Sequence, residues 1–139
     1  MTSRLTFKNI QPGQEIPVLT KSPNTQQLVM WAGASGDYNP IHYDKDFALG
    51  KGLPGVIVPG QLVLAFLGQM VTDWFGEKGE LKKISVSYKG MNIPGDSITC
   101  RGIVKSKDED TNQVTLEVWA ENPKGEKNVA GAAIVKILE

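Results

Sequence analysis

The residues from Gln61 to Phe75 limit most strongly how this chain can fold. Ten of these fifteen residues are apolar, and they occupy nearly the whole circumference of a helix. A helix without a polar face is a buried helix. The segment is also too short, and too often interrupted by polar residues and glycine, to span a bilayer. Pro59 fits the start of such a helix, where its missing N–H is no loss. The rest of the chain must therefore surround this helix.

Four segments in the second half of the chain alternate between apolar and polar residues, as half-buried strands do. They are Leu81–Met91, Ser97–Lys107, Val114–Ala120 and Asn128–Leu138. Turn residues separate them at 92–96, 107–112 and 122–125. These short connections predict that neighbouring strands are antiparallel. A buried helix with such a sheet curled around it is an α+β arrangement.

Shorter elements are expected before the buried helix. Glu15–Leu19 is a candidate strand, and the spacing of Leu28, Trp31 and Ala32 predicts a helix over about 24–34. Thr20 or Ser22 is the expected cap of that helix. Asp44 is expected to begin a brief helical turn whose residues Phe47 and Ala48 point inward.

The chain of 139 residues is long enough for one domain, and we interpret residues 1–139 as a single domain. Its net charge is zero and it has no basic block, which argues against nucleic acid or an anionic membrane as partner. Cys100 is the only cysteine, and residues 1–9 contain no apolar signal core. A cytoplasmic location is expected, with Cys100 as a buried thiol in a strand.

The loop Ser35-Gly36-Asp37-Tyr38-Asn39-Pro40-Ile41-His42-Tyr43 contains the only histidine of the chain. Gly36 and Asn39-Pro40 bend the backbone, so Asp37 and His42 can meet at one point. A carboxylate beside an imidazole is suited to proton transfer. A lone histidine is, however, more often a structural residue than a catalyst. The two residues alone leave both interpretations open.

The string Ser-Gly-Asp-Tyr-Asn-Pro-Ile-His resembles the hydratase motif of the MaoC-like, (R)-specific enoyl-CoA hydratase family (hydratase 2). Pro94-Gly95-Asp96 after a strand, and Gly131-Ala132-Ala133 in the last strand, also look like this family. The resemblance covers the chain from the first helix to the C-terminus. It implies the hot-dog fold, in which an antiparallel sheet wraps around a long central helix.

The resemblance implies a hydro-lyase of fatty acid metabolism. Such an enzyme reversibly adds water to a trans-2-enoyl thioester and forms a (3R)-3-hydroxyacyl thioester, without a metal or redox cofactor. Asp37 and His42 match the catalytic pair, with Asp37 as the base toward the water and His42 as the proton donor, or the reverse. Gly60 is expected to present backbone N–H groups to the thioester oxygen, or simply to start the helix.

The resemblance also bears on Asn39 and Pro59. Asn39 is expected to order the loop by bonding its own backbone, with direct substrate contact as the alternative. Pro59 is a departure, because many family members have histidine before this glycine; the proline lacks that polar side chain and a backbone donor.

The substrate carrier is expected to be coenzyme A or an acyl carrier protein. Cations on the predicted strands are candidates to meet its phosphates or acidic face: Lys82, Lys83, Lys89 and Arg101. The family implies a homodimer, with a heterodimer as the alternative. Two other functions share the fold: a thioesterase, and a non-catalytic acyl-binding subunit of a heterodimer. The intact motif argues against both.

Overall fold

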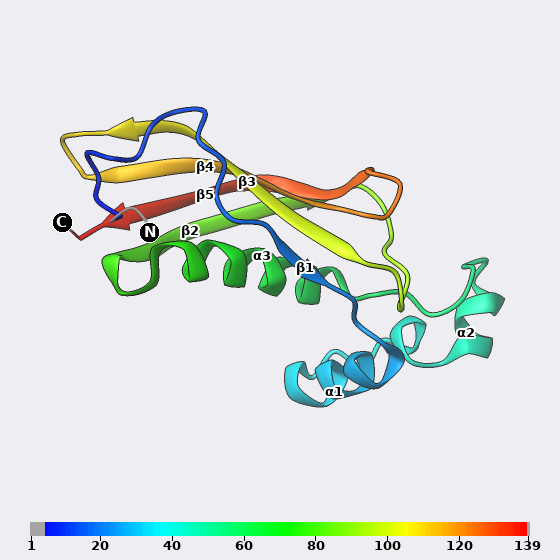
Figure 1. The fold of residues 1–139 in the computed structure, drawn as a ribbon. Coiled ribbons are helices and arrows are strands. Elements are labelled where there is room, and N and C mark those ends of the chain that lie inside the picture. The colour runs from blue at the N-terminus through cyan, green and yellow to red at the C-terminus, as the bar shows by residue number, and fades with distance from the viewer. Residues whose placement is uncertain (1–4, 139) are drawn as a thin grey trace.

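A computed structural model describes residues 5–138 of the chain. Five strands form one antiparallel sheet that curves over a long helix, α3, and two short helices extend beyond one end of the sheet (Figure 1). The elements are β1 Leu19–Lys21, α1 Thr25–Ser35, η1 Pro40–His42, α2 Lys45–Gly50, α3 Gly60–Phe75, η2 Gly76–Lys78, β2 Gly79–Tyr88, β3 Ile98–Asp108, β4 Gln113–Glu121 and β5 Lys127–Ile137. This is the hot-dog arrangement that the sequence predicted. The termini of the expected domain, residues 1–4 and 139, lie outside the described residues.

The apolar side of α3 is buried, as predicted, but the helix is not buried all round. Its exposed face consists of Gln61, Ala65, Gln69, Thr72 and Asp73. The buried residues of α3 are Leu62, Val63, Phe66, Leu67, Met70, Val71 and Phe75. The strands supply the other half of the core through their inward-facing positions. On β4 these are Val114, Leu116, Val118 and Ala120, each fully buried. Burial of this much apolar surface is the main contribution to the stability of the fold.

The strand order is β1-β3-β4-β5-β2, and every pair is antiparallel. The connections β3–β4 and β4–β5 therefore join paired strands. The strand β2, in contrast, pairs with β5 and not with β3, the next strand along the chain. Residues 89–97 cross from one edge of the sheet toward the other. The predicted antiparallel pairing across the connection at 92–96 was therefore wrong, because alternation within strands carries no information on which strands pair.

Three expectations for the first half of the chain were wrong. No continuous strand covers Glu15–Leu19. Residues 13–16 form backbone hydrogen bonds to β3, and β1 begins only at Leu19. Pro17 interrupts the ladder between them because it has no N–H to donate. The cap of α1 is Asn24, whose Oδ1 accepts from the N–H of Gln27 at 2.9 Å, and not Thr20 or Ser22.

The third error concerns Phe47. Ala48 is fully buried, but Phe47 is exposed beside the ammonium group of Lys51. Neighbouring residues of a helix point about 100° apart, so the short α2 buries only one of the two.

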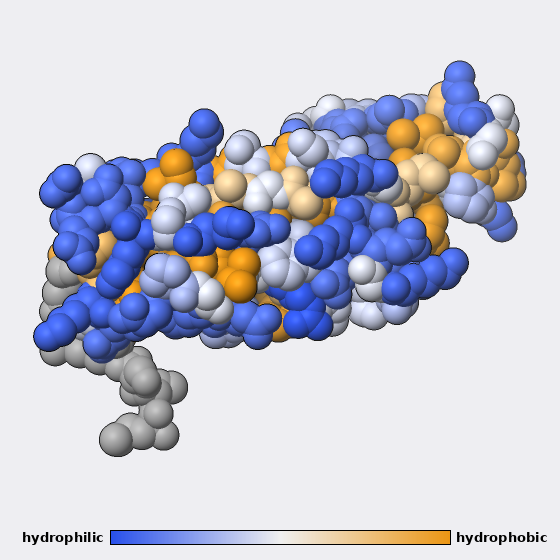
Figure 2. All heavy atoms as spheres, turned by 90° about the horizontal axis from the view of Figure 1, so that it is seen from above, coloured by the Kyte–Doolittle hydropathy of each residue, from blue (hydrophilic) through white to orange (hydrophobic). Residues whose placement is uncertain are grey.

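The outer face of the sheet in Figure 2 is largely hydrophilic, and hydrophobic surface gathers at the end of the molecule that carries α2.

Cys100 is a fully buried, free thiol in β3, as predicted. Burial raises the pKa of this thiol to about 12. Within residues 5–138 we find no helix that combines the length and apolar character needed to cross a membrane.

Candidate active site

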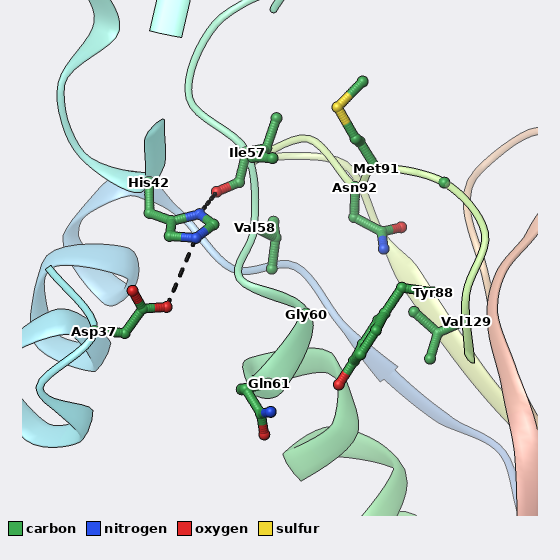
Figure 3. A pocket seen from close by; sticks show the side chains of 11 residues that line it. Asp37, His42, Ile57, Val58, Gly60, Gln61, Tyr88, Met91, Asn92 and Val129 are labelled. Carbon is green, nitrogen blue, oxygen red and sulfur yellow. Dashed lines mark hydrogen bonds and ion pairs between the residues drawn. The ribbon is translucent and has the colours of Figure 1, made fainter. Parts of the chain in front are cut away.

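A cavity of about 340 Å³ opens at the N-terminal end of α3 (Figure 3). Its walls come from segments that are far apart in the sequence: the Asp37–His42 loop, residues 57–61, residues 88–92 and the start of β5. Asp37, His42 and Gly60, three of the residues singled out from the sequence, line it together. Most of its remaining wall is apolar.

The imidazole of His42 is held by the backbone of a neighbouring segment. Its Nδ1 lies 2.8 Å from the carbonyl oxygen of Ile57, and the N–H of Ile57 donates to the carbonyl of Ile41 at 3.1 Å. A carbonyl oxygen can only accept, so Nδ1 carries the hydrogen and donates it. The neutral ring therefore presents an unprotonated Nε2 to the cavity. Its side chain is only 10% exposed.

The carboxylate of Asp37 faces this nitrogen. Its Oδ2 is 3.7 Å from Nε2 of His42, while its Oδ1 accepts from the N–H of Asn39 at 3.2 Å. Gly36 ends α1 with a φ of 78°, which turns the chain so that Asp37 faces His42. The separation of 3.7 Å exceeds a direct hydrogen bond, and one water molecule can donate to both acceptors.

The first turn of α3 offers backbone donors beside this pair. The N–H groups of Leu62 and Val63 donate to the carbonyl of Pro59 at 3.0 and 3.3 Å. Those of Gly60 and Gln61 precede them, and no acceptor in residues 5–138 bonds to either. A Cβ atom at Gly60 would lie 2.7 Å from Cε1 of Tyr88, so the absent side chain leaves space for that ring.

The other residues assigned from the sequence lie elsewhere. Asn39 is exposed, and its Oδ1 accepts from the N–H of Ile41 at 3.3 Å, which caps η1. It is not part of the cavity wall. Among the candidate cations, Lys82 pairs with Glu80 and Arg101 with Glu121. Lys82, Lys83, Lys89 and Arg101 are not among the described residues that line the cavity.

Tyr88, Met91 and Asn92 are among the residues of the cavity that were not foreseen from the sequence. Tyr88 ends β2, and Asn92 lies in the segment that we had interpreted only as a turn. Asn92 is just 5% exposed, and its neighbour Asn128 only 8%. A turn residue is normally solvated, so nothing in the pattern marked Asn92 as buried.

Across residues 5–138 no group of three or more histidine, cysteine, aspartate or glutamate side chains could hold a metal ion.

Comparison with known proteins gives a consistent result. The (R)-specific enoyl-CoA hydratase of Aeromonas caviae is 27% identical over 134 residues, which are 96% of this chain and 99% of that protein. The solved structure of an (R)-hydratase from A. caviae involved in PHA biosynthesis superposes with a TM-score of 0.88 at 27% identity. It covers 94% of this chain and 98% of the other.

A local match joins the chain to a much larger protein. Fatty acid synthase subunit beta of Aspergillus oryzae is 40% identical over 75 residues, which are 52% of this chain. The chain spans only about 4% of the length of that subunit. The model of the MaoC like domain matches residues 7–123, which include the whole Asp37–His42 loop and the first turn of α3. The chain belongs to the MaoC-like domain family.

Proposed function

We propose that this protein is an enoyl-thioester hydratase that also catalyses the reverse dehydration. The observation that carries the proposal is the pair of Asp37 and His42, whose reactive atoms lie 3.7 Å apart in a cavity at a helix N-terminus. The similarity to an (R)-specific enoyl-CoA hydratase over nearly the full length of both chains supports it. The product is then a (3R)-3-hydroxyacyl thioester.

Hydration breaks one O–H bond of water and the π bond between C2 and C3, and it forms a C3–O bond and a C2–H bond. A water molecule between Oδ2 of Asp37 and Nε2 of His42 has two acceptors for its hydrogens, so its oxygen lone pair is free to attack C3. One member of the pair takes the proton. We assign Asp37 as this base; the proton that it takes from water passes to Nε2 of His42, and the imidazolium ion so formed delivers it to C2, which leaves Asp37 ionised and the ring neutral again.

The donation of Nδ1–H to Ile57 restricts the protonation of His42. Since Nδ1 keeps its hydrogen, proton transfer takes place at Nε2 alone, the atom that faces Asp37. His42 can give a proton to C2 only as an imidazolium ion, which the ionised Asp37 beside it stabilises. Asp37 and His42 share one mobile proton, so the roles of base and acid cannot be assigned to one residue alone. With His42 as the base and Asp37 as the acid, the same two atoms, Nε2 and Oδ2, carry the proton.

In this mechanism the free N–H groups of Gly60 and Gln61 bind the thioester oxygen. Negative charge develops on this oxygen as water attacks C3, and helix N-termini stabilise such charge. The carbonyl of Pro59 accepts from the N–H groups of Leu62 and Val63, and its ring offers no donor. The mechanism therefore needs no polar side chain at position 59, where many family members have histidine.

The substrate carrier and the assembly are part of the same proposal. Either coenzyme A or an acyl carrier protein can present the enoyl thioester. The ten-residue strand β2 lies at one edge of the sheet, and a long open edge favours pairing with another strand. We propose that two copies pair through it into a homodimer, with a heterodimer as the alternative. Light scattering after size-exclusion chromatography tests the stoichiometry.

The decisive experiment follows loss of the enoyl absorbance of a short-chain enoyl-CoA. Asp37→Asn preserves an acceptor for the N–H of Asn39 but removes the base. His42→Asn preserves a donor for the Ile57 carbonyl but removes Nε2. Each change is expected to lower kcat by about 10³-fold, within the range of one proton transfer. Asp46→Asn, an equal loss of charge on the exposed side of α2, is the control and leaves kcat unchanged.

Other results would replace the proposal. Hydrolysis of the thioester, detected as free thiol, would identify a thioesterase. A wild-type protein that binds acyl thioesters but turns over neither coenzyme A nor carrier-protein substrates would be the acyl-binding subunit of a heterodimer.

A further inference from the structure

Asn92 is a buried amide that lines the cavity among several apolar residues. It is 5% exposed and lines the cavity together with Ile57, Val58, Met91 and Val129. Burial of an amide in such surroundings is costly unless each polar atom has a partner. The partners of Asn92 therefore indicate what the cavity is built to hold.

A chain of hydrogen bonds fixes which end of the Asn92 amide faces the cavity. The carbonyl oxygen of Met91 can only accept, so the atom of Asn128 at 2.9 Å from it is Nδ2. The same Nδ2 lies 3.3 Å from the Asn92 side chain and must donate there too, which makes that atom Oδ1. The remaining atom of Asn92 is Nδ2, a donor. No acceptor in residues 5–138 bonds to it, and it is not sealed from solvent.

The backbone around this pair is held on several sides. The N–H groups of Lys89 and Gly90 both donate to the carbonyl of Asn128, and the N–H of Val58 donates to the carbonyl of Asn92 at 2.9 Å. Gly90 has to lack a side chain, because a Cβ atom there would overlap Oδ1 of Asn128. Contacts with Lys89, Gly90 and Val58 therefore fix the backbone of the Asn92–Asn128 pair.

The unpaired donor lies on the far side of the cavity from the proton-transfer pair. Figure 3 shows Asn92 opposite Asp37, with Val58 between them, and its amide nitrogen directed toward Tyr88, another residue of the cavity wall. In a pose with the thioester oxygen at the first turn of α3 and C3 beside Asp37 and His42, the acyl carbons beyond C3 would be the part of the substrate that approaches Asn92. The volume of about 340 Å³ is at the lower end of ligand cavities and suits a short acyl group.

We infer that Asn92 is a specificity-determining residue, and that the preferred substrate is a short acyl thioester with a keto or hydroxyl oxygen beyond C3. That oxygen accepts from Nδ2 of Asn92. A purely alkyl chain would leave the buried donor unpaired, and such a site discriminates against ligands that lack the acceptor. The assignment of a reaction to this substrate rests on the proposed hydratase function, whereas the recognition by Asn92 does not.

The test measures binding of saturated ligands that cannot be hydrated. Calorimetry compares 4-oxopentanoyl-CoA with pentanoyl-CoA on the wild type, Asn92→Leu and Asn92→Asp. Asn92→Asp retains the shape and the acceptor for Asn128 but loses the donor, so it carries the test even if the leucine variant does not fold. We expect the wild type to bind the keto ligand about tenfold more tightly, and both variants to lose this preference.

Equal affinity of the wild type for both ligands, binding of neither, or a preference that survives in Asn92→Asp would overturn the inference. An equal loss of both ligands in the variants would also overturn it, because Asn92 would then contact the common thioester. Enoyl-CoA turnover in the same preparations separates the two proposals. A keto preference without hydration contradicts only the hydratase, and hydration without a preference contradicts only the role of Asn92.

Discussion

Replacement of Gly60 by alanine distinguishes the two explanations of this glycine: an oxyanion site, or merely the start of a helix. The added Cβ atom would lie 2.7 Å from Cε1 and 2.9 Å from Cδ1 of Tyr88, and real contacts of this kind are rarely closer than 3.4 Å. The ring must therefore move by somewhat less than about 1 Å. Since Tyr88 is 49% exposed, it can move toward solvent.

The expected cost to folding is small. Alanine is favoured over glycine within a helix by up to about 1 kcal/mol, and displacement of a half-exposed ring cancels a similar amount. The free energy of unfolding should change by less than about 1 kcal/mol. The methyl group nevertheless enters the cavity beside the N–H groups that are proposed to bind the thioester oxygen. Loss of one such donor costs about 10²–10³-fold in kcat, and we expect about 10²-fold.

The assay combines enoyl-CoA turnover with urea unfolding of the same preparations. Tyr88→Ala in the Gly60→Ala background removes the collision and serves as the matched control. If the methyl group acts only by displacing Tyr88, the double variant recovers the activity of Tyr88→Ala alone. Activity of Gly60→Ala within about threefold of the wild type would refute the reasoning, because the glycine would then only accommodate Tyr88.

Three further predictions concern the fold. Gly131→Ala should lower the free energy of unfolding by about 3 kcal/mol or more in urea, because the added Cβ atom would overlap the Ser85 carbonyl of β2. The control Ala132→Ser, on the opposite face of the sheet, should change it by less than about 0.5 kcal/mol, and equal effects of the two changes would contradict the prediction. Asn24→Ala should cost about 1 kcal/mol by loss of the α1 cap, and an unchanged midpoint would exclude that role. With a pKa of about 12, the thiolate fraction of Cys100 near pH 8 is on the order of 10³ lower than that of an unperturbed thiol. Iodoacetamide should therefore modify Cys100 far more slowly in the native than in the unfolded protein, and equal rates would contradict its burial.

The parts of the fold that the sequence predicted are those that depend on one residue pattern. The α3 helix was evident because most of its residues are apolar, although its exposed polar face was not predicted. The strand β4 was evident because its apolar residues alternate: Val114, Leu116, Val118 and Ala120. Each pattern reports local geometry and burial together. The pairing of β2 with β5 depends on how a long connection crosses the sheet, which alternation does not encode.

The candidate site divides in the same way. Asp37 and His42 lie in one continuous motif with recognisable turn residues, so their proximity could be predicted. The fixed tautomer of His42 could not, because it depends on a carbonyl fifteen residues away in sequence, that of Ile57. Asn92 was missed for a similar reason: its side chain bonds to Asn128, which is thirty-six residues further along the chain.

The N-terminal residues show another limit. Ile10 is fully buried and Ile16 nearly so, although neither belongs to a helix or strand. Ile16 packs where Gly102 has no side chain, and Gly102 lies on β3. A short irregular segment has no periodicity to reveal such a contact. Only the folded sheet creates the space that this segment fills.

The account depends most on Asp37 and His42 acting as one unit. The most direct test is kcat for Asp37→Asn, His42→Asn and the double variant with the same enoyl-CoA. If the two side chains share one mobile proton, loss of either disables the pair, and the double variant should be no more than about threefold slower than the slower single variant. Independent roles predict that the two losses multiply, to on the order of 10⁶-fold for two proton transfers of about 10³-fold each. A multiplicative loss, or full activity in either single variant, would contradict the mechanism.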